Sequence, residues 1–88
     1  SLKMLYDYSC QMTGEKVGES YSAMVVEAHH IIPFTESLNN DTTNIIILSP
    51  SYHRIVHKAK PTFDRKQLAF CFPNGLVDKV KLNKHLKD

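Results

Sequence analysis

EAHHIIPF, residues 27 to 34, places two histidines side by side within an apolar run. The wider stretch YSAMVVEAHHII is rich in β-branched and aromatic residues and predicts a strand. Pro33 should end this strand, because proline offers no donor to a β-ladder. Neighbouring side chains on a strand point to opposite faces. His29 and His30 should therefore face different surroundings and have different tasks.

A loop, a second strand and a helix follow. TESLNNDTTN, residues 35–44, is polar and predicts a loop, and NIIIL, residues 44–48, predicts a short apolar strand. In SPSYHRIVHKAK, Ser49 suits the helix N-cap and Pro50 suits the first helical position. We expect a helix from about Pro50 to Lys58, so the middle of the chain reads strand, loop, strand, helix.

The flanking segments give weaker patterns. Residues 1–9 fit either a short helix or a strand, and CQMTG, residues 10–14, predicts a turn. A connecting stretch after Pro61 leads to QLAFCF and LVDKVKL. These two runs flank Pro73-Asn74-Gly75 and predict a C-terminal β-hairpin. The last residues, NKHLKD, are expected to form a frayed tail or part of a linker that was cut.

Length and composition set the class. The chain has 88 residues, of which 42% are hydrophobic and 23% charged, as suits a single globular domain. No apolar run approaches the roughly 20 residues that span a bilayer, and no signal-peptide pattern opens the chain. The chain begins with serine rather than methionine, so we expect either a piece of a longer protein or a chain that was tagged and cleaved. A disulfide between Cys10 and Cys71 is the alternative, but we expect both cysteines to be free thiols. We also expect a cytoplasmic, bacterial protein.

Basic residues cluster although the net charge is only +2. Five lie between residues 54 and 66, where Asp64 is their only acidic neighbour, and a second group occupies residues 79–87. The two groups consist of Arg54, Lys58, Lys60, Arg65 and Lys66, and of Lys79, Lys81, Lys84 and Lys87. Such stretches beside a candidate site favour an anionic substrate, although taken alone a solvated lysine face explains them better.

Four of the five histidines fall in the strand-loop-strand-helix segment. His53 and His57 are four residues apart, so both imidazoles should lie on one face of the predicted helix. If this helix packs across the two strands, a strand histidine can supply a third metal ligand. Three nitrogens with open positions left make a catalytic rather than a structural metal site. The strand pair or the helix pair alone could arise by chance, whereas their combination indicates a metal site. His85 lies outside this pattern and should have no special role.

The stretch EAHHIIPF…NIIILSPSYHRIVH resembles the HNH, or ββα-metal, nuclease motif, and within it the colicin-type DNases most closely, over about residues 24–58. The resemblance implies an α+β fold, in which an antiparallel hairpin and a metal-binding helix form the core. The C-terminal hairpin would complete a single domain over residues 1–88. CQMTG also resembles the Cys-x-x-[Cys or Thr]-Gly opening of many HNH proteins, but Thr13 replaces the second cysteine and argues against a structural zinc.

The resemblance also assigns roles to the histidines. It implies one divalent metal ion held by three of them: His29, His53 and His57. It implies His30 as the general base and Asn44 as the catalytic residue that braces the loop beside this base. Imidazole ligands favour a transition metal, so zinc, nickel, cobalt or manganese is expected before magnesium.

Three further residues are candidates for supporting roles. Glu27 matches an acidic position before the paired histidines and is expected to sit behind the metal ligands. Arg54 and Lys58 are candidates for binding flanking phosphates, and helix-end solubility explains them about equally well.

The expected function is metal-dependent hydrolysis of DNA to 5′-phosphate and 3′-hydroxyl ends, in the cleavage domain of a restriction enzyme. A further DNA-recognition domain or a homodimer would supply specificity, and a toxin nuclease stays open. The alternative is a non-catalytic, metal-stabilised nucleic-acid-binding module. His30 and Asn44 favour the nuclease, because a purely structural metal site needs neither. A plain structural domain leaves the four histidines unexplained.

Overall fold

The structure is a computed structural model that describes residues 1–33 and 41–87. Short helices and strands alternate along the described chain, and one helix, α3, has several turns. The elements are α1 (Leu2–Leu5), the 3₁₀ helix η1 (Glu19–Tyr21), β1 (Glu27–His30), the 3₁₀ helix η2 (Thr42–Asn44), β2 (Ile45–Leu48), α3 (Pro50–Ala59), β3 (Thr62–Asp64), β4 (Ala69–Cys71) and β5 (Val77–Lys79).

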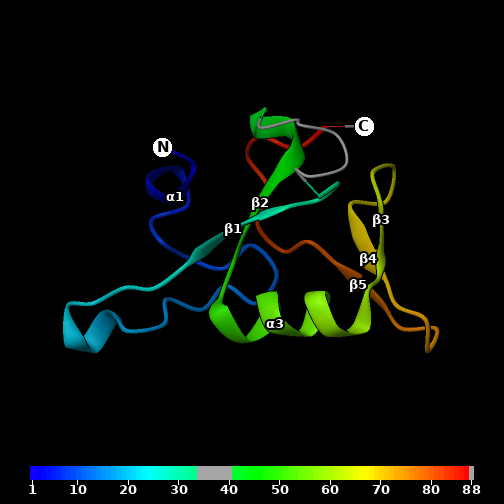
Figure 1. The fold of residues 1–88 in the computed structure, drawn as a ribbon. Coiled ribbons are helices and arrows are strands. Elements are labelled where there is room, and N and C mark those ends of the chain that lie inside the picture. The colour runs from blue at the N-terminus through cyan, green and yellow to red at the C-terminus, as the bar shows by residue number, and fades with distance from the viewer. Residues whose placement is uncertain (34–40, 88) are drawn as a thin grey trace.

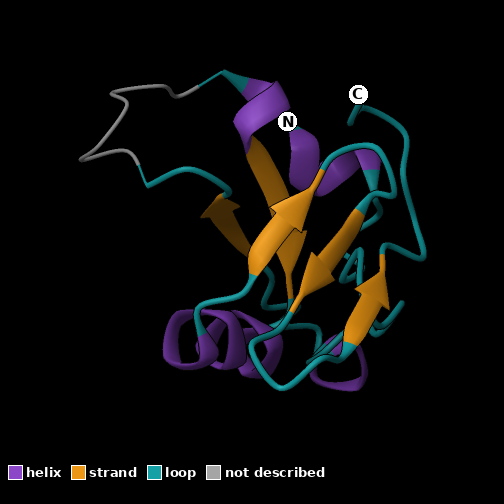
Figure 2. Ribbon diagram, turned by 90° about the vertical axis from the view of Figure 1, so that its right-hand side faces the viewer, coloured by secondary structure: helices purple, strands orange, loops and turns teal. Residues whose placement is uncertain are grey.

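The strands form two antiparallel sheets. β1 pairs with β2 so that Glu27 lies opposite Leu48 and His30 opposite Ile45. β3, β4 and β5 form the second sheet in sequence order. Figures 1 and 2 show α3 at one end of both sheets, and α3 contacts β1. This mixed α/β arrangement of antiparallel sheets and one longer helix agrees with the predicted α+β class.

Helix α3 begins and ends at local sequence signals. The Ser49 hydroxyl accepts a hydrogen bond from the Tyr52 amide at 3.2 Å, and Pro50 occupies the first turn, where no backbone donor is needed. Lys60 caps the other end in the left-handed conformation, at φ 53°. The predicted start is therefore confirmed, and the helix extends one residue beyond the predicted Lys58.

The core is built on both faces of β2. Ile46 and Leu48 lie in one cluster, which α3 joins through Tyr52 and Val56 and the second sheet through Phe70. Ile47 points the other way, into a smaller cluster with Tyr6 and Val26. Burial on both faces explains why β2 reads as an unbroken apolar run instead of an alternating one.

The first predicted strand is too long. Of the stretch YSAMVVEAHHII, β1 keeps only Glu27–His30, and η1 occupies Glu19–Tyr21. Because β2 contributes only four residues to the pairing, residues before Glu27 find no partner there. They fold back at Gly18 instead, where the Ala23 amide bonds to the Gly18 carbonyl at 3.0 Å. The predicted loop lies partly outside the described residues, and its end forms η2.

The C-terminal hairpin is confirmed and gains a strand. The Asn74 side chain and Gly75, at φ 93°, form the turn between β4 and β5. The stretch that was expected only to connect contains β3, which pairs with β4.

Cys10 and Cys71 are free thiols, as expected. None of the helices that the structure describes is long and apolar enough to cross a bilayer.

The predicted frayed tail is wrong as far as Lys87, the last described residue. Leu86 is only 4% exposed and belongs to the main core cluster. His85, for which no role was expected, bridges two distant segments: its Nε2 bonds to the Ile45 carbonyl at 2.8 Å, and its Nδ1 bonds to the Tyr6 hydroxyl. A carbonyl only accepts, so Nε2 carries the proton and Nδ1 accepts from the tyrosine. These contacts fasten the chain end to β2 and to the segment after α1.

Candidate metal centre

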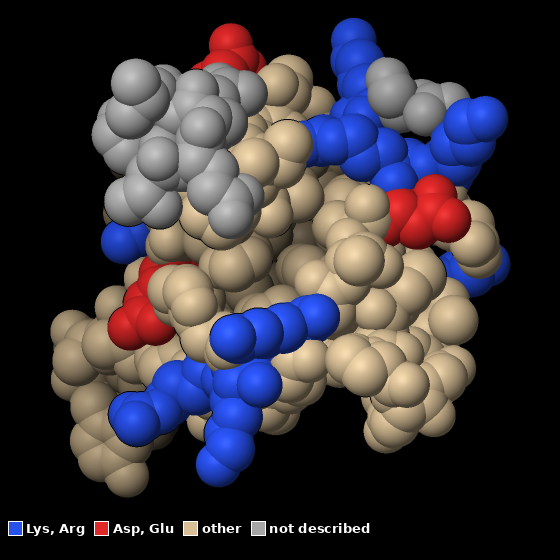
Figure 3. All heavy atoms as spheres, turned by 45° about the vertical axis from the view of Figure 1, so that its right-hand side comes forward, with Lys and Arg blue, Asp and Glu red and all other residues tan. Residues whose placement is uncertain are grey.

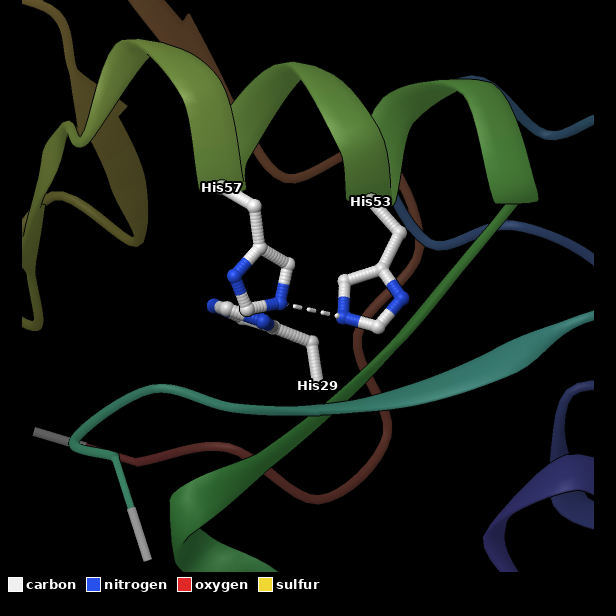
Figure 4. A group of neighbouring side chains, drawn as sticks. All are labelled: His29, His53 and His57. Carbon is white, nitrogen blue, oxygen red and sulfur yellow. Dashed lines mark hydrogen bonds between the residues drawn. The ribbon is translucent and has the colours of Figure 1, made fainter. Parts of the chain in front are cut away.

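The structure brings together three histidines from β1 and α3. Figure 4 shows His29 rising from the strand toward His53 and His57, which point down from adjacent turns of the helix. One ring nitrogen of each lies within 4.8 Å of the others, and the Nε2 atoms of His53 and His57 are 3.0 Å apart. The i, i+4 spacing on α3 and the packing of α3 against β1 produce this group.

Glu27 lies directly behind the group. Its Oε1 accepts from Nδ1 of His53 at 2.7 Å, which leaves Nε2 of His53 turned toward His57. A carboxylate bonded to one ring nitrogen fixes the tautomer and makes the other nitrogen a better metal ligand. Glu27 and His29 are two residues apart on β1, so both side chains project from one face of this strand.

The chemistry of these donors fits a divalent ion. Burial, followed by the nearby charges of His53 and His57, lowers the pKa of His29 to about 4. This imidazole is therefore neutral at pH 7, which is the form that binds metal. Two nitrogens bound to one ion at about 2.0–2.1 Å lie roughly 3–4 Å apart, and the 3.0 Å separation on α3 meets this requirement. His29, His53 and His57 are thus the residues that could hold a metal.

His30 lies next to the group without belonging to it. Among the described residues the metal-ligating set includes His29 and leaves out His30, and both line one cavity of about 680 Å³. Asn44 is 0% exposed and pairs with the backbone just after His30: its Oδ1 accepts from the Ile32 amide and its Nδ2 donates to the Ile32 carbonyl, both at 2.9 Å. Asn44 therefore fixes the exit of β1, close to His30.

The structure places the predicted phosphate-binding residues at the edge of the site. Arg54 and Lys58 are exposed and line a shallow hollow with His53 and His57, outside the larger cavity. The cation that does line the larger cavity is Lys60, which the sequence places in the basic cluster without singling it out. Figure 3 shows lysine and arginine side chains gathered in two groups on this face, with a hollow between them.

Sequence reasoning also missed the apolar side of this cavity and a tie to η2. Phe63 and Phe70 line the cavity, and the Arg65 guanidinium donates to the Thr43 carbonyl at 2.9 Å, next to Asn44. Phe63 is the middle residue of β3, and Arg65 directly follows this strand. Their places depend on the pairing of β3 with β4, for which no local signal exists beyond a three-residue run.

Comparison with known proteins gives one match. Residues 10–70 match the family described as HNH endonuclease, while no curated protein and no solved structure matches. The matched region contains the turn at Cys10, all three residues of the histidine group, and β4 as far as Phe70. It covers more than half of the chain, and it implies a nuclease whose substrate is DNA. The chain therefore belongs to the HNH endonuclease family.

Proposed function

We propose that the chain is a metal-dependent endonuclease domain that hydrolyses DNA phosphodiester bonds and leaves 5′-phosphate and 3′-hydroxyl ends. The observation that carries this proposal is the convergence of His29, His53 and His57, with Glu27 bonded to His53, in a chain of the HNH family. A bound divalent ion would supply a positive charge that stabilises negative charge as it develops on the phosphate. The imidazole donors favour a transition metal such as zinc, nickel or cobalt over magnesium.

His30 is the general base in this proposal. Histidine is the side chain that most often acts as a general base, and His30 lines the same cavity as the histidine group. Its imidazole takes a proton from a water molecule, whose oxygen attacks the phosphorus in line while the bond to the 3′ oxygen breaks. The leaving oxygen gains a proton from solvent and becomes the 3′-hydroxyl. Asn44 supports this step because its two hydrogen bonds to the Ile32 backbone keep the end of β1, and with it His30, in position.

Arg54, Lys58 and Lys60 provide the electrostatic attraction for DNA. All three are exposed, and they flank the histidine group along the helix and at its end. Contacts to phosphates give affinity without reading sequence. A small domain of this kind suits the cleavage part of a restriction enzyme, where another domain or a second copy selects the site.

Plasmid cleavage tests the proposal. Supercoiled plasmid is incubated with the protein and a panel of divalent ions, with EDTA as the control. We expect cleavage only with metal. His30→Ala should keep metal binding, measured by calorimetry, and lose cleavage by several orders of magnitude, whereas His57→Ala should weaken both.

Two results would contradict this scheme. Cleavage by His30→Ala at the parent rate removes the general base. Metal and DNA binding without any cleavage by the parent protein would favour the non-catalytic binding module.

A further inference from the structure

The residues that line the cavity beside the histidine group are of two chemical kinds, which we name its polar side and its apolar side. One side carries the imidazoles and Lys60, and the other is apolar. The apolar side is formed by Ile31, Pro33, Val56, Pro61, Phe63 and Phe70. The volume, about 680 Å³, lies within the range of about 300–1,000 Å³ that is typical of small-molecule sites. Phosphate hydrolysis alone uses only the polar side.

Phe63 is an aromatic residue of the apolar side that is partly exposed. Phe70, which also lines the cavity, is 2% exposed, and the centroid of its ring lies 6.2 Å from that of the His29 ring. Phe63 is half-buried, and its ring meets Phe70 edge to face at a centroid distance of 5.0 Å. This contact and the β3–β4 pairing hold the Phe63 ring in place, one aromatic neighbour away from the histidine group.

Lys60 is the charged lining residue at the end of α3, between His57 and Pro61 in the sequence. It sits at the C-cap of α3, where its amide bonds to the Val56 carbonyl at 2.9 Å, and Pro61 follows at once. The backbone is therefore fixed there, while the exposed side chain is free to approach an anion at the mouth of the cavity. A phosphate held between Lys60 and the histidines leaves the attached nucleoside next to the apolar side.

We propose that this cavity binds an unpaired nucleobase adjacent to the scissile phosphate, with the base against Phe63 and the phosphate near Lys60. The inference rests on the proposed nuclease function and adds a substrate class to it: DNA with an unstacked base, as in single strands, loops or distorted sites. A base inside a duplex is paired and stacked on both faces, so it cannot enter. Aromatic side chains bind unpaired bases of any sequence by stacking, because every base has a π-face.

The test compares two single-stranded probes of equal length and charge. One is a short oligothymidine, and the other has the same backbone with every base removed. Affinity is measured by fluorescence anisotropy in EDTA, where no metal-dependent cleavage consumes the probe. We expect the parent to bind the probe with bases roughly 5- to 150-fold more tightly, from the stacking contribution of a base on an aromatic ring.

Variants assign the effect to Phe63. Phe63→Leu keeps an apolar side chain but loses the ring, so the preference for bases should disappear, while Phe63→Tyr should retain it. Phe72→Leu is the matched control, because Phe72, directly after β4, packs on the same core without lining the cavity. Far-ultraviolet circular dichroism checks that each variant folds.

The outcomes separate this inference from the proposed function. Equal binding of both probes by the parent, no binding of either, or an unchanged preference in Phe63→Leu overturns the nucleobase site. Plasmid cleavage would still support the nuclease in those cases. A base-dependent affinity that requires Phe63 supports the site, even if no metal produces cleavage and the nuclease proposal fails.

Discussion

Replacing Asn44 tests how the end of β1 is held beside His30. The Asn44 side chain is fully buried and makes two hydrogen bonds of 2.9 Å to the Ile32 backbone. Each such bond contributes about 1 kcal/mol net, and a buried group left without its partner adds to the loss. We therefore expect Asn44→Ala to lower the free energy of unfolding by about 2–4 kcal/mol.

Asn44→Asp distinguishes the two bonds. An aspartate oxygen can still accept from the Ile32 amide, but a second oxygen then faces the Ile32 carbonyl, which also only accepts. Burial against this carbonyl should raise the pKa of the introduced carboxyl above its unfolded value of about 3.9. Its protonated form can donate in place of the amide. Relative to Asn44→Ala, this variant should gain stability as the pH falls toward 3.9 and lose it as the pH rises through the folded pKa.

Urea unfolding of metal-free protein at a series of pH values measures both effects. The difference between the two variants should depend on pH, while Asn74→Asp, at an exposed turn, controls for an added carboxylate. Cleavage should fall in both Asn44 variants, because Ile32 lies two residues from His30. A loss below about 1 kcal/mol in Asn44→Ala, or a difference between the variants that stays constant with pH, would refute the bonding scheme.

Three further expectations follow from the site and the core. Glu27→Gln should weaken zinc binding, measured by calorimetry, by roughly 10- to 100-fold, because the charged partner of His53 is lost. The control variant Glu15→Gln, at an exposed position outside the histidine group, should bind zinc like the parent. Leu86→Ala should cost about 2–5 kcal/mol in urea unfolding, whereas Leu76→Ala, at 56% exposure, should change little; equal effects would mean that the tail is not docked. Zinc at about 100 times its dissociation constant should raise the parent's free energy of unfolding by about 2.7 kcal/mol in thermal denaturation, and a similar rise in His57→Ala would place zinc elsewhere.

The sequence predicts those elements whose signals are local. Ser49 and Pro50 define the start of α3 by themselves, and Asn74-Gly75 defines a turn whatever surrounds it. The histidine group could also be predicted, because the i, i+4 spacing fixes His53 and His57 on one face. Alternation along the strand left the third member of this group open between His29 and His30, and the resemblance chose His29.

Other features depend on contacts between distant residues, and no local pattern carries them. The length of β1 is set by β2, which offers only Ile45–Leu48 as partners. The role of His85 depends on Tyr6, 79 residues earlier in the chain, and on the Ile45 carbonyl. Phe63 lines the cavity because β3 pairs with β4, and a strand of three residues is too short to be recognised without its neighbour.

Helix α3 contributes to both the core and the candidate site, through two sets of residues that differ by one position in the sequence. Tyr52 and Val56 are four apart and buried, and His53 and His57 are four apart and face the cavity. One residue is about 100° of helix rotation, so the apolar stripe and the histidine stripe are adjacent. The Tyr52 hydroxyl donates to Asp78 at 2.8 Å, which fixes the rotation of α3 against the second sheet. A rotation that exposed Tyr52 would also carry both histidines away from His29, and for this reason the packing that stabilises the domain also positions its candidate metal ligands.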